Sequence, residues 1–136
     1  MKVVRLTPTA ILPVRAHVTD LGYDLFADSS EKIIHGETVK ISTGIAIGFP
    51  PGYGGFIKDR SSMASKGLFT TGGVIDNGYT GEISVMMTNS GSEYYISKGD
   101  KIAQLVLIPV TNVEIEEVDS LGETDRGSKG FGSSGT

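Results

Sequence analysis

The chain has no cysteine, no tryptophan and only two histidines among its 136 residues. Without cysteine it forms neither disulfide bonds nor thiolate metal sites. His17 and His35 have no spacing typical of a metal site or a catalytic triad, so we expect both at the surface. No apolar run approaches the roughly 20 residues of a transmembrane helix. The segment Met1–Leu6 is too short for the apolar core of a signal peptide. We therefore expect a cytoplasmic protein, with a nuclear or viral setting left open.

Positive charge is also scarce. The net charge is −4, and lysine and arginine are dispersed along the chain. Proteins that bind nucleic-acid duplexes need basic stripes, so this pattern argues against such partners but leaves room for a nucleotide. Glycine, by contrast, is abundant at 19 residues, about double the average usage of roughly 7%. This abundance predicts many tight turns joining short strands in a single domain.

The hydrophobic pattern repeats mostly every second residue. Ile83, Val85 and Met87 alternate with other residues, which predicts a strand with one buried face. The apolar run 102–108 predicts a strand buried on both faces. Val113 and Ile115 alternate with glutamates, which predicts a half-solvated strand.

A single stretch predicts a helix, residues 60–66, with Gly67 as the glycine that ends it. Asp59 or Ser61 is expected to cap its start. The many short strands and one short helix together predict an all-β fold, a jelly-roll-like β-sandwich or barrel. A mobile C-terminal arm is expected to follow.

The last eleven residues, 126–136, combine two cations, four glycines, three serines and one aromatic ring. Glycine lets backbone N–H groups approach an anion, and Arg126 can bind a phosphate through two parallel hydrogen bonds. Phe131 can stack on a base. The same residues also fit a frayed tail or a linker, and taken alone they favour that interpretation.

Two further segments combine turn and site chemistry. Asp59-Arg-Ser-Ser62 lies at the start of the expected helix, where N–H groups, the arginine and two hydroxyls suit a phosphate. Taken alone, the segment favours a capped surface helix with a solvated arginine. Residues 72–82 predict a β-hairpin with its turn at Asp76-Asn-Gly78. Asp76 is then a turn former or a functional carboxylate, and Tyr79 is unusual for a plain turn.

Two polar residues lie within strand-like segments. Asp24 either faces solvent or contacts a hydrated divalent cation, since Mg²⁺ often takes one or two carboxylates together with substrate phosphates. Gln104 interrupts an apolar strand and needs partners there. It either bonds to neighbouring backbone or positions a water molecule.

Five segments, in this order, closely resemble the five motifs of the trimeric deoxyuridine triphosphatase (dUTPase) family. They are Gly22-Tyr-Asp-Leu-Phe-Ala27, Asp59-Arg-Ser-Ser-Met-Ala-Ser-Lys-Gly67, Gly73-Val-Ile-Asp-Asn-Gly-Tyr-Thr-Gly-Glu-Ile83, Gly99-Asp-Lys-Ile-Ala-Gln104 and Arg126-Gly-Ser-Lys-Gly-Phe-Gly-Ser-Ser-Gly135. The third motif departs from the family, because Gly78 and Thr80 stand where an acidic residue and an arginine are usual.

The resemblance implies a homotrimer whose three active sites are each built from all three chains. It implies Mg²⁺-dependent hydrolysis of dUTP to dUMP and pyrophosphate, which limits uracil incorporation into DNA and supplies dUMP for thymidylate synthesis. It also divides the chain into a jelly-roll core, residues 1–125, and a flexible arm, residues 126–136, that closes over the site. Neither a nucleic acid nor a membrane is expected as a partner.

The resemblance also assigns roles to individual residues. Asp76 is the general base, Gln104 positions the attacking water, and Asp24 contacts the hydrated metal. Tyr79 packs under the deoxyribose and excludes a 2′-hydroxyl. Uracil is read by the backbone around Gly73, Val74 and Ile75 and is stacked by Phe131. The phosphates are held by Arg60, Ser61, Ser62, Arg126, Gly132, Ser133 and Ser134.

Two other functions fit parts of the sequence. A dCTP deaminase shares this fold but carries a catalytic glutamate three residues before the position of Asn89, where this chain has Met86. A thioether cannot transfer protons, which argues against deamination. A non-enzymatic protein that binds nucleotide or a regulatory partner is the second alternative, although none of the motif residues is lost.

Overall fold

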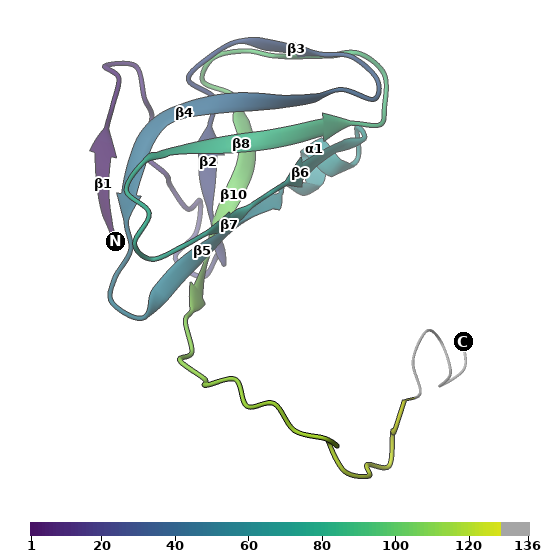
Figure 1. The fold of residues 1–136 in the computed structure, drawn as a ribbon. Helices are drawn as coiled ribbons and strands as arrows, with labels where there is room; N and C mark the ends of the chain where they lie inside the picture. Colours follow the sequence, from purple (N-terminus) through teal and green to yellow (C-terminus); the bar gives the residue numbers. More distant parts are fainter. Residues whose placement is uncertain (129–136) are drawn as a thin grey trace.

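Two antiparallel four-stranded sheets and one two-stranded sheet form the fold in a computed structural model that describes residues 1–128 (Figure 1). The first sheet has the order β1 (Lys2–Arg5), β4 (Thr38–Gly48), β8 (Glu82–Asn89) and β6 (Leu68–Thr71). The second has the order β2 (Gly22–Phe26), β10 (Lys101–Pro109), β5 (Tyr53–Asp59) and β7 (Val74–Ile75). The third pairs β3 (Glu31–Ile33) with β9 (Tyr94–Ile96). The expected all-β, jelly-roll-like sandwich is confirmed, as an open sandwich rather than a closed barrel.

The core lies between the sheets and follows the predicted alternation. In β8 every second side chain is buried, with Ile83, Val85 and Met87 fully enclosed. In β10 Ile102 and Leu105 are fully buried. Burying each such side chain contributes roughly 1.5–3 kcal/mol, so these central strands fix the scaffold on which the polar residues are held. Within residues 1–128, no helix is long and apolar enough to span a membrane.

The helix α1 (Ser61–Ala64) is shorter than predicted, and its start is built differently. Arg60 is the N-cap residue, and no side chain caps the helix. The Asp59 carboxylate instead accepts hydrogen bonds from the backbone N–H and the hydroxyl of Thr70, both at 2.6 Å. The expected cap by Asp59 or Ser61 is therefore wrong, because Asp59 ties β5 to β6 and Ser61 lies within the helix.

The predicted hairpin at residues 72–82 is also wrong in its pairing. β7 pairs with β5, whereas β8 pairs with β4 and β6, so the two arms belong to different sheets. A turn does form between them, where the Tyr79 N–H donates to the Asp76 carbonyl at 3.1 Å. Because the arms diverge into two sheets, a space opens between β7 and β8.

The chain leaves the sandwich after β10 as an extended arm (Figure 1). Its described part, residues 110–128, contains no strand, and Ile115 is 100% exposed. The half-solvated strand predicted at Val113 and Ile115 is thus absent from the single chain. A strand needs a neighbour for its backbone groups, and no other described segment pairs with this one.

Candidate active site

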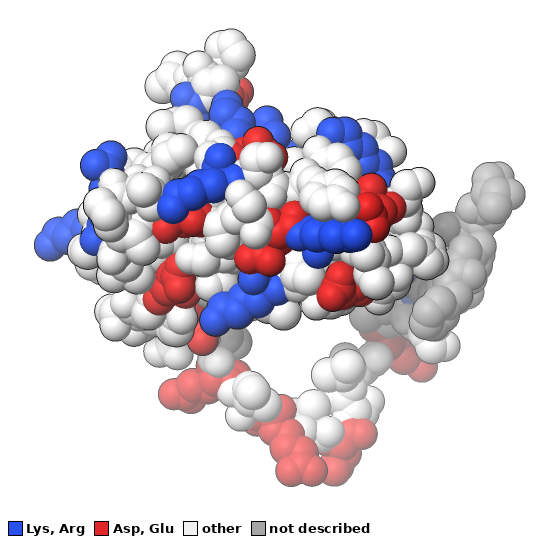
Figure 2. All heavy atoms as spheres, turned by 90° about the horizontal axis from the view of Figure 1, so that it is seen from above, with Lys and Arg blue, Asp and Glu red and all other residues white. Residues whose placement is uncertain are grey.

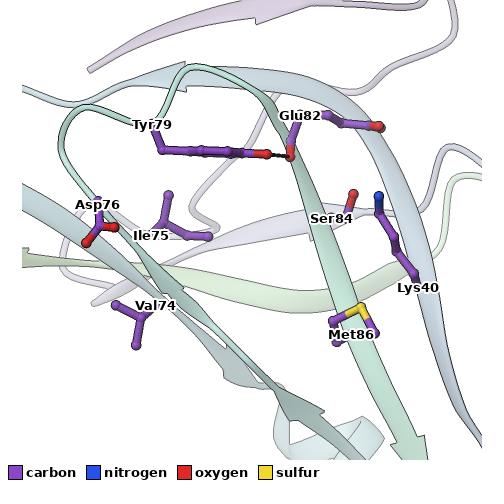
Figure 3. A pocket seen from close by; sticks show the side chains of 8 residues that line it. All are labelled: Lys40, Val74, Ile75, Asp76, Tyr79, Glu82, Ser84 and Met86. Atoms are coloured by element: carbon purple, nitrogen blue, oxygen red, sulfur yellow. Dashed lines mark hydrogen bonds between the residues drawn. The ribbon is translucent and has the colours of Figure 1, made fainter.

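The space between β7 and β8 is a pocket of about 270 Å³ (Figure 3). This is close to the lower end of the roughly 300–1,000 Å³ typical of small-molecule sites. Its walls come from both sheets and from the loop that joins them. The lining residues are Lys40, Val74, Ile75, Asp76, Tyr79, Glu82, Ser84 and Met86. Four predicted site residues from one sequence motif, Val74, Ile75, Asp76 and Tyr79, therefore share one cavity.

Tyr79 is fixed beside this pocket by a hydrogen bond and by a close approach. Its hydroxyl donates to the Glu82 carbonyl at 3.0 Å, as drawn in Figure 3. A Cβ atom at Gly81 would lie only 2.5 Å from the tyrosine oxygen. Glycine at position 81 is therefore required for the ring to lie flat against the loop, with 44% of the residue still exposed.

The two carboxylates that line the pocket differ in their partners. Glu82 accepts hydrogen bonds from the Ser42 hydroxyl and, at 2.9 Å, from the Gly44 N–H. These bonds hold Glu82 onto β4. The side chain of Asp76 has neither a hydrogen bond nor an ion pair among the described residues. Asp76 is accordingly the pocket carboxylate that is available to a ligand or a water molecule.

A second polar group lies where β2 and β10 pair, near the start of α1. The register sets Asp24 opposite Gln104. The Arg60 Nε atom lies 3.0 Å from Asp24 Oδ1, and the Lys101 Nζ atom lies 2.8 Å from Oδ2. Arg60 also donates to the Lys101 carbonyl at 3.1 Å and contacts the Ser62 hydroxyl at 3.4 Å. Both oxygens of Asp24 are thus occupied by cations, which orient Arg60 beside the hydroxyls of α1.

Gln104 belongs to this second group. Its Nε2 atom donates to the Asp59 carbonyl at 2.8 Å, which is the structural bond that the sequence left open. A Cβ atom at Gly22 would lie 2.2 Å from Gln104 Oε1, so glycine makes room for the amide. Positioning of a water molecule by Gln104 stays a prediction.

The two groups do not meet within one chain. Gln104 pairs with Lys58 on β5, whereas the β5–β7 register places Asp76 next to Gly54, at the other end of the same strand. Four residues of strand at about 3.3 Å each separate these positions by roughly 13 Å along β5. A single chain therefore presents two half-sites.

Comparison with known proteins gives the same family as the motifs. A family model described as dUTPase matches residues 9–135. The chain belongs to the dUTPase family. A deoxyuridine 5′-triphosphate nucleotidohydrolase of Gloeothece citriformis is 46% identical over 139 residues, covering 99% of this chain and 96% of the relative. One from Clostridium kluyveri is also 46% identical, over 138 residues, covering 98% and 96%.

Solved structures of dUTPases share the fold. That of the Staphylococcus bacteriophage 80alpha enzyme with dUpNHpp has a TM-score of 0.93 and 32% identity, covering 99% of this chain and 98% of that one. That of a phage phi11 variant, described for its coordination of a structural Mg(II) ion, has a TM-score of 0.82 and 30% identity, covering 88% and 97%.

The described residues fit the family's metal only in a limited way. Among residues 1–128, no three His, Cys, Asp or Glu side chains gather closely enough to hold an ion. Asp24 is the predicted ligand, and both of its oxygens already contact cations. This donor set suits an ion held chiefly by substrate phosphates, with one carboxylate contact, as is usual for Mg²⁺.

Of the remaining predicted residues, some lie near β7, one lies on the arm, and four are not described by the structure. Gly73 lies against β5, where its carbonyl accepts from the Ile57 N–H at 2.7 Å. β7 is an edge strand, so Val74 and Ile75 present backbone groups away from β5, toward the pocket. Arg126 lies on the exposed arm. Four predicted residues fall outside the described part of the chain: Phe131, Gly132, Ser133 and Ser134.

Three polar pocket residues, and the apolar Met86, were not predicted as site residues from the sequence. Glu82 and Ser84 lie on the outward face of β8, and the alternation with Ile83 and Val85 was enough to place them there. The sequence pattern around Lys40 does not indicate that this residue lies in the pocket. Only the register of β4 on β8, with Lys40 opposite Met86, brings it to the pocket.

Proposed function

We propose that this chain hydrolyses dUTP to dUMP and pyrophosphate, and that the pocket between β7 and β8 binds the deoxyuridine. The observation that carries this function is the pairing of a fixed ring with an unengaged carboxylate in one cavity. Tyr79 is held by Glu82 and Gly81, and Asp76 lies beside it without a partner among the described residues. A nucleoside needs a surface for its sugar, and its hydrolysis needs a proton acceptor.

The ring of Tyr79 packs against the deoxyribose in this proposal. A 2′-hydroxyl would collide with the ring, so ribonucleotides are excluded by shape. The base enters between the diverging strands, where the free edge of β7 offers backbone N–H and carbonyl groups at Val74 and Ile75. Such groups distinguish one base edge from another by hydrogen bonding, and Phe131 stacks on the base from outside.

Asp76 acts on the attacking water. Its carboxylate takes a proton as the water oxygen bonds to phosphorus, the bond between the α- and β-phosphates breaks, and pyrophosphate leaves. General-base catalysis of this kind typically contributes about 10²–10⁴-fold. The rest of the rate comes from positioning and from stabilising charge on the phosphates.

Phosphate binding falls to the second half-site. Arg60 is oriented by Asp24 and by the Lys101 carbonyl, and it retains guanidinium N–H groups for an anion. With four residues, α1 contributes little helix dipole, so Arg60 and the hydroxyls of Ser61 and Ser62 do the binding. Arg126, Gly132, Ser133 and Ser134 close over the terminal phosphates.

The separation of the half-sites supports a homotrimer with shared active sites. The pocket with Asp76 comes from one subunit, and the group of Asp24, Arg60 and Gln104 comes from a second. The arm supports association as well, because Val113 and Ile115 are 77% and 100% exposed in the single chain. Large apolar side chains exposed in an alternating pattern are typical of a segment that pairs with another chain.

Mg²⁺ is the proposed cofactor. When bound, it would neutralise charge on the triphosphate, and Asp24 is the residue of this chain that would contact it. The reaction keeps uracil out of DNA and supplies dUMP for thymidylate synthesis.

Pyrophosphate release from a nucleotide panel tests the function. With the full chain we expect rapid release from dUTP in Mg²⁺, strong loss of rate with a chelator, and little release from UTP or dCTP. Ammonia release from dCTP would instead identify a deaminase. Binding of dUTP without pyrophosphate release would identify a non-enzymatic nucleotide binder.

A further inference from the structure

The pairing of β10 with β2 contains an irregularity next to the second half-site. Ala103 lies opposite Leu25, but the next pair along the ladder is Lys101 with Phe26. Ile102 is therefore an extra residue in β10. Ile102 and Ala103 are neighbours in the chain, yet both side chains are fully buried. This is the pattern of a β-bulge, in which two residues of one strand oppose one residue of the other.

The bulge turns the side chain of Lys101 to the outer face of the sheet. In a regular strand side chains alternate, and Lys101 would share the buried face of Ala103. The extra residue reverses this alternation, so Lys101 lies on the same face as Asp24 and Gln104. Its Nζ atom lies 2.8 Å from Asp24 Oδ2 and 5.9 Å from the centre of the Phe26 ring. Bulges next to functional sites commonly redirect a side chain in this way.

Lys101 reaches Arg60 by two routes. The Lys101 carbonyl accepts a hydrogen bond from Arg60 Nη1 at 3.1 Å. The Lys101 ammonium group contacts one oxygen of Asp24, whose other oxygen lies 3.0 Å from Arg60 Nε. The last torsion of an aspartate side chain is broad, so a carboxylate with a single partner turns easily. With Lys101 on one side, the carboxylate is held in the orientation that suits Arg60.

We propose that Lys101 is a positioning residue, which holds the Arg60 guanidinium in the orientation that binds the phosphates of dUTP. This inference rests on the proposed function, in which Arg60 binds phosphate. Lys101 acts through Asp24 and does not itself contact the nucleotide. A guanidinium that is already oriented loses less conformational freedom when an anion binds, which increases affinity.

The test compares Lys101→Met and Lys101→Arg with the wild type, and Lys98→Met is the matched control. Lys98 also pairs with an aspartate, Asp28, at 3.2 Å, and its side chain is 44% exposed, close to the 40% of Lys101. Calorimetry with a non-hydrolysable dUTP analogue measures binding of the whole nucleotide. Calorimetry with deoxyuridine, which has no phosphate, measures the pocket alone. Thermal melts measure stability.

We expect Lys101→Met to weaken binding of the dUTP analogue by about three- to tenfold and to leave binding of deoxyuridine unchanged. A hydrogen bond to a charged group is typically worth about tenfold or more, and partial exposure to water reduces this value. Lys101→Arg keeps a donor for Asp24 and therefore keeps the affinity. Lys98→Met lowers the melting temperature but leaves both affinities unchanged.

A double-mutant cycle with Arg60→Met shows whether Lys101 acts through Arg60. Once the guanidinium is absent, Lys101→Met should cause little further loss of affinity for the analogue, because no group remains to be positioned. Losses that add in the double variant would show that Lys101 contacts the phosphates directly, and would overturn the inference.

Two other outcomes would also overturn it. One is an unchanged affinity for the analogue in Lys101→Met. The other is an equal loss for the analogue and for deoxyuridine together with a lower melting temperature, which indicates a general structural role. A wild-type protein that binds the analogue but releases no pyrophosphate from dUTP would overturn the proposed function instead, and the result for Lys101 would still stand.

Discussion

At the scale of single residues, the carboxylates around the candidate site differ in whether they have hydrogen-bond or ion-pair partners. Asp24 contacts two cations, Asp59 accepts two hydrogen bonds from Thr70, and Glu82 is held on β4. Each of these carboxylates holds a neighbouring group in place. Asp76, which lacks such a partner among the described residues, is free to accept a proton. Position in the network, rather than residue type, thus distinguishes Asp76, the proposed general base, from its neighbours.

Replacing Asp76 tests this assignment. Asp76→Asn keeps the size of the side chain but removes the proton acceptor, so we expect turnover of dUTP to fall by about 10²–10⁴-fold. Affinity for a non-hydrolysable dUTP analogue should change little, because the walls of the pocket are intact. Single-turnover kinetics and calorimetry measure the two quantities. Near-normal turnover in the variant would remove Asp76 from this role.

At the scale of elements, the turn after α1 depends on one glycine. Gly67 has φ of +81°, and a Cβ atom there would lie 2.6 Å from the backbone nitrogen of Gly91. The turn therefore packs directly on the loop after β8, where Ser90 N–H donates to the Gly67 carbonyl at 2.8 Å. Since α1 carries Ser61 and Ser62, this contact also helps to place the side chains that we propose bind phosphate.

The substitution Gly67→Ala should destabilise the protein more than Gly36→Ala. Gly36 has φ of +79°, and a Cβ atom there would have no other atom within 4 Å. Alanine at position 36 therefore has the same backbone strain as alanine at position 67, but no steric clash. We expect a cost of roughly 1–2 kcal/mol for Gly36→Ala and about 1–3 kcal/mol more for Gly67→Ala. Urea unfolding compares the two variants. Equal losses of stability would show that the close approach to Gly91 is relaxed at no cost.

The segment before β2 is held in place by hydrogen bonds to Asp28, which follows β2 and whose side chain is 5% exposed. Hydroxyls of Thr7 and Thr9 donate to its two oxygens at 2.5 and 2.7 Å, and the Lys98 Nζ atom lies 3.2 Å away. The hydrogen bonds from Thr7 and Thr9, followed by Lys98, hold the pKa of this carboxyl below its ordinary value. One carboxylate thus joins the N-terminal segment to the loop before β10.

Stability should depend on pH through Asp28. Because its pKa is lower in the folded protein than in the unfolded chain, its contribution is complete above the unfolded value of about 3.9 and is lost as pH falls through the folded value. We expect Asp28→Asn to melt at a lower temperature than wild type at pH 7. The difference should narrow below about pH 4. Thermal melts across pH 3–7 measure it, and a constant difference would contradict this linkage.

At the scale of the whole molecule, charge is mixed over the sandwich and mostly negative on the arm. Figure 2 shows basic and acidic side chains interleaved over one face of the sandwich, with acidic side chains along the arm. Those of the arm are Glu114, Glu116, Glu117, Asp119, Glu123 and Asp125. Like charges along a segment repel one another and favour an extended chain. The apolar residues of the arm, among them Val113 and Ile115, stay exposed in the single chain.

Mixing two inactive variants tests the shared site. We expect Asp76→Asn subunits, combined with a chain that ends at Asp125, to recover part of the activity. Some mixed sites then have an intact pocket from one parent and an intact C-terminal segment from the other. Light scattering should give a mass about three times 14.3 kDa. A monomeric mass, or no recovery after confirmed subunit exchange, would contradict the shared-site proposal.

Much of the fold and of the residue set was determined by the sequence itself. The alternation of Ile83, Val85 and Met87 predicted a half-buried strand because a strand turns every second side chain to the same face. Gly67 marked the turn that follows α1, because its conformation is costly for other residues, although the helix itself ends at Ala64. The five ordered motifs identified the family, since side-chain chemistry at fixed spacing is a property of the chain.

Tertiary structure alone decided which of these residues meet. Local spacing predicted a hairpin at Asp76, yet β7 and β8 join different sheets, because strand pairing is decided by long-range contacts with β5 and β4. The same pairing brought Lys40 to the pocket. It also kept Asp76 apart from Gln104 within the single chain. Sequence spacing measures distance along one chain, whereas register sets the distances between strands.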